Sequence, residues 1–220
     1  MSVLLALVAA VTYGVSDFVG GLASRRDTAL RVLVHSYPVG VLLTAALLPL
    51  VPGDLSAGAV GWSAAAGLAG ALGVVLLYLG LATGPMGVVA PLTAVASAVV
   101  PAAVGIGLGE RPPPLAYVGV ALALLAVALV SRGPGGEAGR RPVTARAVWI
   151  ALLAGVGFGC YFVLLARAPE SSGGWPLLVS RISSAVAVVA LALATGRVGR
   201  LSAGVPRLAV AAGAWSSSTK

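Results

Sequence analysis

Apolar residues run along this chain in long blocks that short polar connections separate. Seven blocks come close to the roughly 20 residues that an α-helix needs to cross a bilayer, and they cover residues 3–21, 32–51, 60–81, 88–108, 115–130, 147–166 and 175–194. An eighth block, 205–215, is shorter. Membrane-spanning strands would instead alternate apolar and polar positions over about ten residues. The pattern predicts an all-α integral membrane protein, a helical bundle with seven full spans and a partial eighth.

Composition agrees with a membrane location. Hydrophobic residues make up 59% of the chain, charged residues 9%, and the mean hydropathy is +1.05, whereas soluble domains are about a quarter charged. The first block has no basic residue before it and leads into further spans, so it is interpreted as a mature helix and not as a cleaved signal peptide.

Arginines set the expected orientation. Ten of them fall in connections that alternate along the chain and so share one side: Arg25, Arg26, Arg31, Arg132, Arg140, Arg141, Arg146, Arg197, Arg200 and Arg207. The opposite side holds Arg111, Arg167 and the terminal Lys220. Because cytoplasmic loops are rich in Lys and Arg, the first set is predicted to be cytoplasmic and the N-terminus outside.

Few residues could support an enzyme. One Cys and one His leave no disulfide framework and no zinc spacing. The sequence has no Walker-type phosphate loop and no G-x-S-x-G elbow. No basic stretch alternates with aromatic residues, so no nucleic-acid partner is expected. We therefore expect no enzyme activity, no cofactor and no metal, and the energy for any transport must come from a gradient or another chain.

A weak internal repeat organises the chain. Shifted by 145 residues, LALVAAVTYG (5–14) lies over IALLAGVGFG (150–159), and a shift of 146 places His35 opposite Arg181. A repeat unit of five spans has an odd number of crossings, so its second copy starts on the other side of the membrane. The sequence thus predicts inverted five-helix repeats, an architecture typical of secondary transporters with a site where the copies meet.

One stretch resembles a known family. GLATGPMGVVAPLTAVASAVVPAAVGIGLGERPPPLAYVGVALALLAVALVS (80–131) is similar to the fourth and fifth helices of an EamA domain of the drug/metabolite transporter (DMT) superfamily. YGVSDFVGGLASRR (13–26) also resembles the first helix of bacterial members. The motif residues that carry the resemblance are Pro91, Pro101, Gly109, Glu110 and Arg111. It implies a bacterial inner-membrane transporter that moves small metabolites by alternating access, usually with ten helices and both termini in the cytoplasm.

These observations divide the chain into three parts. Residues 1–131 are predicted to form the first EamA-type repeat, 132–145 a Gly/Pro/Arg-rich linker, and 146–220 an incomplete second repeat of two spans plus the start of a third. A second copy of the same length would end roughly around residue 276, whereas the sequence ends at Lys220 with a polar segment. We therefore expect a truncated second repeat.

The candidate solute and proton site consists of polar residues inside the apolar blocks. Tyr13, Ser16 and Asp17 share one helical face, because they are spaced i, i+3 and i+4. An ionised group within a membrane costs about 2.5–3.5 kcal/mol and needs a partner or a wet cavity. Either Asp17 and His35 form a proton-coupled or solute-binding pair, or Asp17 pairs locally near Arg25 and His35 is a packing residue.

The later blocks add further candidates. Thr93 and Ser97 follow a Gly/Pro-interrupted helix start and either line the site or bond back to their own helix. Arg181 either binds an anionic group or extends to the interface. Glu110 and Arg111, at the end of their block, fit a helix cap or a loop ion pair better than a solute contact. We expect the binding candidates to face the bundle interior, and the glycine pairs Gly80/Gly84, Gly105/Gly109 and Gly155/Gly159 to allow close helix packing.

Two function classes follow. The first is a gradient-driven transporter of small metabolites or drugs, or a non-functional fragment of one. The second is a non-transporting membrane subunit that packs against another copy of itself. The expected partners are the lipid bilayer, a small-molecule substrate and a second copy of the chain.

Overall fold

A computed structural model describes residues 29–131 and 143–196 of the chain. The elements in order are α2 (Ala29–Leu47), η1 (Leu48–Leu50), α3 (Ala57–Thr83), α4 (Met86–Gly107), α5 (Pro114–Ser131), α6 (Ala145–Leu165), η3 (Glu170–Ser172) and α7 (Trp175–Ala194). Every regular element in these two ranges is helical. The predicted all-α class is confirmed.

The described helices support a multi-pass membrane protein. By length and composition, 5 of them could cross a membrane: Leu33–Leu50, Ala57–Thr83, Met86–Gly107, Ala145–Leu165 and Trp175–Ala194. They coincide with the predicted blocks 32–51, 60–81, 88–108, 147–166 and 175–194. The block 115–130 forms α5 but is not among these spans. Blocks 3–21 and 205–215 lie outside the described residues, so the count of seven full spans and a partial eighth stays a prediction.

Side chains and backbone turns define where the helices begin and end. Ser56 Oγ accepts a hydrogen bond from Ala59 N at 3.1 Å, and Thr144 Oγ1 accepts one from Ala147 N at 3.2 Å. Each caps an otherwise unpaired amide at a helix N-terminus. These caps explain why α3 and α6 begin at the residues that follow Ser56 and Thr144.

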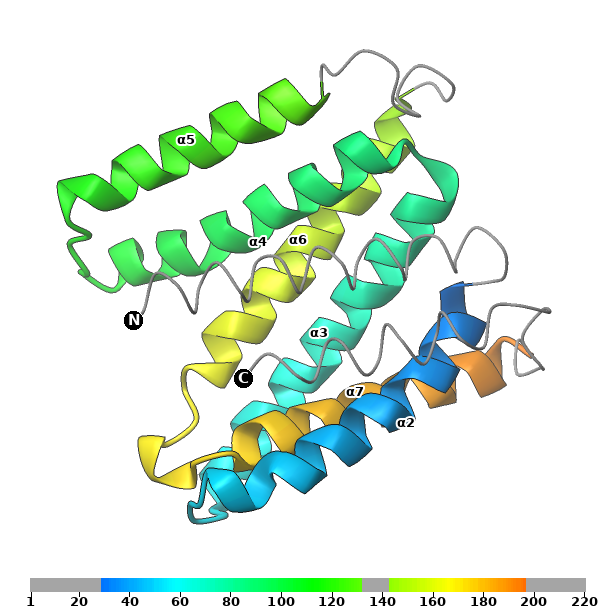
Figure 1. The fold of residues 1–220 in the computed structure, drawn as a ribbon, viewed down its shortest axis with the longest axis vertical. Coiled ribbons are helices and arrows are strands. Elements are labelled where there is room, and N and C mark those ends of the chain that lie inside the picture. The colour runs from blue at the N-terminus through cyan, green and yellow to red at the C-terminus, as the bar shows by residue number, and fades with distance from the viewer. Residues whose placement is uncertain (1–28, 132–142, 197–220) are drawn as a thin grey trace.

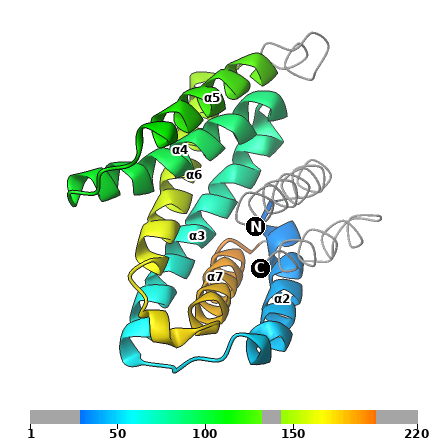
Figure 2. The same cartoon turned by 60° about the vertical axis from the view of Figure 1, so that its left-hand side comes forward.

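The helix α3 lies at the centre of the described bundle. Figures 1 and 2 show α6 crossing one side of α3, while α7 and α2 lie side by side on its other side. The colours show that α2 and α7 run in opposite directions. On the far side of α6 lies α4, and α5 packs against α4 at the edge.

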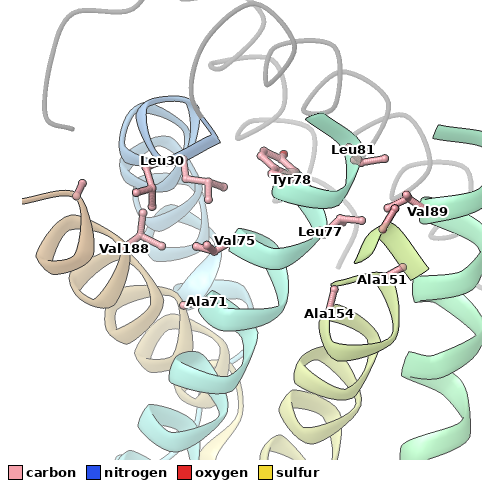
Figure 3. Packing of buried hydrophobic residues seen from close by; sticks show 13 residues of the cluster. Leu30, Ala71, Val75, Leu77, Tyr78, Leu81, Val89, Ala151, Ala154 and Val188 are labelled. Carbon is pink, nitrogen blue, oxygen red and sulfur yellow. The ribbon is translucent and has the colours of Figure 1, made fainter. Parts of the chain in front are cut away.

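The apolar core has two parts that share α3. In Figure 3, Ala71 and Val75 point toward Leu30 of α2 and Val188 of α7. On the other side, Leu77 and Leu81 of α3 lie near Val89, Ala151 and Ala154 of α4 and α6. Large apolar side chains also point outward, including Leu115 at 77% and Leu42 at 70% exposure, as expected where lipid covers a helix.

Glycines bring the α3 and α6 backbones together. A Cβ placed on Gly157 would lie 2.9 Å from the Gly73 Cα, and one placed on Gly73 would lie 3.1 Å from the Ala154 oxygen. Such distances are shorter than the optimum of about 3.5–4.0 Å for carbon contacts. The crossing therefore depends on two residues without side chains.

The predicted packing glycines behave in two ways. A Cβ on Gly84 would lie 3.0 Å from the Ala147 Cβ, and one on Gly159 would lie 2.9 Å from the Val100 Cγ1. Gly80 and Gly155 are equally close to neighbouring helices, so close packing is confirmed for those two pairs. The pair Gly105/Gly109 was wrong as a packing motif, because Gly105 is covered by the Glu110 carboxylate that follows its own helix, and a Cβ on Gly109 would meet nothing within 4 Å.

Candidate functional site

Part of the predicted site lies outside the described residues. Tyr13, Ser16 and Asp17 belong to residues 1–28, which the structure does not describe. Their place on a polar face of the first block stays a prediction.

His35 lies on α2, and its place in a solute or proton site stays a prediction. Its side chain is exposed on α2, and its Nδ1 lies 2.8 Å from the Arg31 carbonyl oxygen one turn earlier. When protonated at Nδ1, the ring donates to its own helix. Two positions later on α2, Tyr37 hydrogen-bonds with the Ser184 side chain of α7.

Thr93 and Ser97 take different roles, although both lie on α4 and are spaced i and i+4. Thr93 is 3% exposed, and its Oγ1 donates to the Ala151 carbonyl oxygen of α6 at 3.1 Å. Ser97 is partly buried and donates to the Ala94 oxygen of its own helix at 2.8 Å. Thr93 therefore joins two helices, whereas Ser97 bonds within one.

The family-motif residues shape α4 and its end. Pro91 and Pro101 lie inside the helix. At its C-terminus the Glu110 N–H donates to the Gly105 oxygen at 2.9 Å, and the Gly109 N–H donates to the Ile106 oxygen at 3.0 Å. Gly109 has a φ of +93°, a conformation that favours glycine. This pair of bonds is a Schellman cap, and Arg111 follows it as an exposed residue.

We call Tyr37 of α2, Tyr161 of α6, and Arg181 and Ser184 of α7 the Tyr37 cluster. Tyr37 hydrogen-bonds with the Ser184 side chain and interacts electrostatically with Arg181 and Tyr161. Ser184 is 5% exposed, and its Oγ donates to the Gly67 carbonyl oxygen of α3 at 2.6 Å. Since a serine hydroxyl has one hydrogen, Tyr37 is the donor in its bond with Ser184.

Glycines on α3 make room for this cluster. A Cβ on Gly70 would lie 3.0 Å from the Tyr161 ring. A Cβ on Gly67 would overlap the Ser183 hydroxyl and the Ser180 carbonyl oxygen. One turn before Gly67, Ser63 is fully buried, and its hydroxyl has no hydrogen-bond partner among the described residues. The α3 face 63–70 therefore combines close contacts with an unused donor.

Sequence reasoning found Arg181 but missed Tyr37 and Tyr161. The available signal was their position within long apolar helices, because tyrosines of membrane proteins are enriched at the interfaces and a phenol deeper in a span needs a polar partner.

A second contact joins the connections on either side of this region. We call residues 51–54 and 171–175 the loop clasp. The Asp54 N–H donates to the Ser171 oxygen at 2.9 Å, and the Gly174 N–H donates to the Val51 oxygen at 3.0 Å. The indole Nε1 of Trp175 donates to the Gly53 oxygen at 3.0 Å. These bonds tie the start of α7 to the connection between α2 and α3.

Within residues 29–131 and 143–196, no group of three or more His, Cys, Asp or Glu side chains could hold a metal ion.

The EamA-like transporter family model matches residues 1–132, more than half of the chain. No curated protein matches the sequence. The matched segment contains α2 to α5 and the Pro91 to Arg111 motif. This chain belongs to the EamA-like transporter family, a family of membrane transporters.

Proposed function

We propose that this chain is a secondary transporter that moves small metabolites or drugs across a bacterial inner membrane by alternating access. The observation that carries the proposal is the Tyr37 cluster. Tyr37 of α2 hydrogen-bonds with Ser184 of α7, so this bond joins the family-matched segment to the segment after it. Secondary transporters hold their solute where two repeats meet.

The directions of α2 and α7 support inverted repeats. These helices correspond under the repeat offset, since a shift of 146 places His35 opposite Arg181. They lie side by side and run in opposite directions (Figures 1 and 2), as two inverted copies of one span would. Tyr37 and Arg181 then belong to corresponding stretches of the two copies.

The loop clasp supports a gate at one end of the bundle. The connections that it joins flank α3 to α6 and are predicted to lie outside, opposite the arginine-rich side. Its hydrogen bonds link the two copies there. In an alternating-access cycle this end opens and closes, and the clasp corresponds to the outward-closed arrangement.

Asp17 is the proposed proton-carrying group of the first span. A carboxylate in a partly desolvated site can take up a proton and release it when solute enters. Asp17→Asn keeps the shape and removes the charge, so we expect normal insertion and loss of pH-dependent uptake. Normal transport with an unchanged pH profile would make Asp17 a structural acid paired near Arg25.

Flux measurements test the proposal. The purified full chain is reconstituted into liposomes that contain a pH-sensitive dye, and a panel of anionic, neutral and cationic solutes is added. Transport predicts solute flux above that of protein-free liposomes, altered by an imposed proton gradient. A non-transporting subunit predicts defined oligomers and no flux for any solute.

A further inference from the structure

We propose that α4 carries a hinge at Pro101, about which the end of α4 and the whole of α5 move as one unit against α3, α6 and α7. We call residues 102–131 the α4–α5 arm. This inference rests on the proposed transport function, which it deepens by naming the part of the chain that moves in the alternating-access cycle. Two prolines lie inside α4, and the packing around them differs.

Each of these prolines weakens the helix where it lies. A proline has no N–H to donate to the carbonyl oxygen four residues earlier, and its ring crowds that carbonyl group. Sharp kinks in helices are therefore found mostly at prolines. In α4, Pro91 cannot donate to the Gly87 oxygen, and Pro101 cannot donate to the Ser97 oxygen. The backbone of α4 can bend at either place unless contacts with other helices hold it.

Contacts on both sides hold the helix around Pro91. Two residues before it, Val89 is 1% exposed, and a Cβ on Gly80 of α3 would lie 2.8 Å from the Val89 Cγ1. Two residues after it, Thr93 donates to the Ala151 oxygen of α6 at 3.1 Å. A bend at Pro91 would have to break this hydrogen bond or displace a buried side chain. Pro91 therefore lies in a fixed part of α4.

Close packing of α4 ends immediately before Pro101. A Cβ on Gly159 of α6 would lie 2.9 Å from the Val100 Cγ1, so α6 receives α4 up to that residue. The residues exposed beyond the proline are Ala102, Ala103, Ile106 and Gly107. The three atoms nearest to a Cβ on Gly105 all belong to Glu110, which follows the same helix. Figures 1 and 2 show this end of α4 pointing away from α6. The described helices thus hold α4 on one side of Pro101 and leave it free to move on the other.

The end of α4 and α5 are joined stiffly to each other. The N–H groups of Gly109 and Glu110 close the Schellman cap of α4, and residues 112–114 are three consecutive prolines. Each proline fixes its own φ. Beyond this connection α5 packs against α4, and each of its side chains that the structure describes is exposed. A bend at Pro101 would therefore carry α5 along with the end of α4.

A modest bend gives a measurable movement. Six residues of α4 follow Pro101, which corresponds to about 9 Å at a rise of about 1.5 Å per residue. Kinks at prolines exceed about 20°, so a change of that size moves the end of α4 by roughly 3 Å. This end and the loop clasp are predicted to lie on the same side of the membrane. Movement of the arm would therefore act at the end of the bundle where the proposed gate lies.

Distances between pairs of spin labels test the hinge in the full chain, reconstituted into lipid nanodiscs in a Cys160→Ala background. The arm pair is Leu115→Cys on α5 with Leu68→Cys on α3. The core pair is Leu68→Cys with Val186→Cys on α7. The three labelled positions are exposed, so the labels replace no packing contact.

Two proline variants form a matched set. Pro101→Ala restores an N–H at the proposed hinge, and Pro91→Ala restores one in the fixed part of α4. We expect the arm pair to give a distance distribution at least roughly 3 Å broader than that of the core pair. Pro101→Ala should narrow it to the width of the core pair, and Pro91→Ala should leave it broad. An arm pair as narrow as the core pair without either proline variant, or one that Pro101→Ala leaves broad, would overturn the hinge.

Solute flux into proteoliposomes separates the hinge from transport. Pro101→Ala should lose most of the flux of the wild type, and Pro91→Ala should retain it. Full flux by Pro101→Ala with a narrowed arm distribution would overturn the role of the arm in the cycle. An arm distribution that Pro101→Ala narrows, without flux of any solute by the wild type, would support the hinge and refute transport.

Discussion

Replacing Gly157 with alanine tests the α3–α6 crossing that holds the two segments together. The added Cβ would lie 2.9 Å from both the Cα and the N of Gly73, and 3.1 Å from the Ala69 oxygen. Carbon contacts are optimal at about 3.5–4.0 Å, so the helices would have to separate by roughly 0.6–1.1 Å at this point. Backbone atoms cannot rotate away as a flexible side chain can.

The expected cost follows from this geometry. An extra methyl group in a tightly packed region destabilises by about 1–3 kcal/mol. Alanine also favours a helix over glycine by about 1 kcal/mol, which would hide part of that cost. Gly61→Ala corrects for it, because Gly61 also lies in a helix and a Cβ there would meet nothing within 4 Å. The difference between the variants should therefore be about 1–3 kcal/mol, with Gly157→Ala the less stable.

The assay is equilibrium unfolding in mixed detergent micelles, followed by circular dichroism, with both variants measured at equal protein concentration. Gly157→Ala should unfold at a lower denaturing-detergent fraction than Gly61→Ala. Equal midpoints would mean that the backbones of α3 and α6 do not approach as closely as described, which would refute the close crossing.

Further changes test the other contacts. Thr93→Val should lower the free energy of unfolding by about 0.6–1.7 kcal/mol, because it removes the hydrogen bond to the Ala151 oxygen of another helix. Ser97→Ala should have little effect, because Ser97 bonds within its own helix. Equal unfolding midpoints for the two variants would contradict the assignment of Thr93 as the residue that joins two helices. Gly173→Ala should weaken the loop clasp, because Gly173 has a φ of +52° and an added Cβ would overlap the Pro52 oxygen. Gly58→Ala, near the same connection, is the control and should leave the clasp unchanged. Equal stability of the two variants would refute the clasp contact. Single cysteines are placed in residues 25–31 and in the linker 132–145, in a Cys160→Ala background, and an impermeant thiol reagent is added outside the cell. We expect neither cysteine to be labelled. Labelling of both would reverse the predicted orientation, and labelling of only one would contradict the predicted number of spans between them.

The helices could be predicted from sequence because lipid leaves the backbone few choices. Without water to satisfy its amides and carbonyls, a long apolar block must form a helix. The block 60–81 became Ala57–Thr83 and the block 175–194 became Trp175–Ala194. The ends differ by a few residues because caps such as Ser56 lie just outside the apolar block.

The site could be predicted only in part, because contacts between helices depend on how each helix is rotated. A helix that is apolar on all sides gives no preferred face, and α3 has this character. Its sequence could not show that Gly67 and Gly70 lie against Ser183 and Tyr161. The i, i+4 spacing of Thr93 and Ser97 likewise predicted a shared face, but not which hydroxyl would reach Ala151.

Accessibility of a cysteine at position 184 tests the central claim, that the Tyr37 cluster lies on a solute path that opens to alternate sides. Ser184→Cys changes one atom at a site that is 5% exposed, and a Cys160→Ala background makes it the sole thiol. An impermeant thiol reagent is applied to whole cells and to inside-out vesicles. We predict slow reaction from outside, where the proposed gate at the loop clasp is closed, and faster reaction from inside. No reaction from either side would contradict the claim.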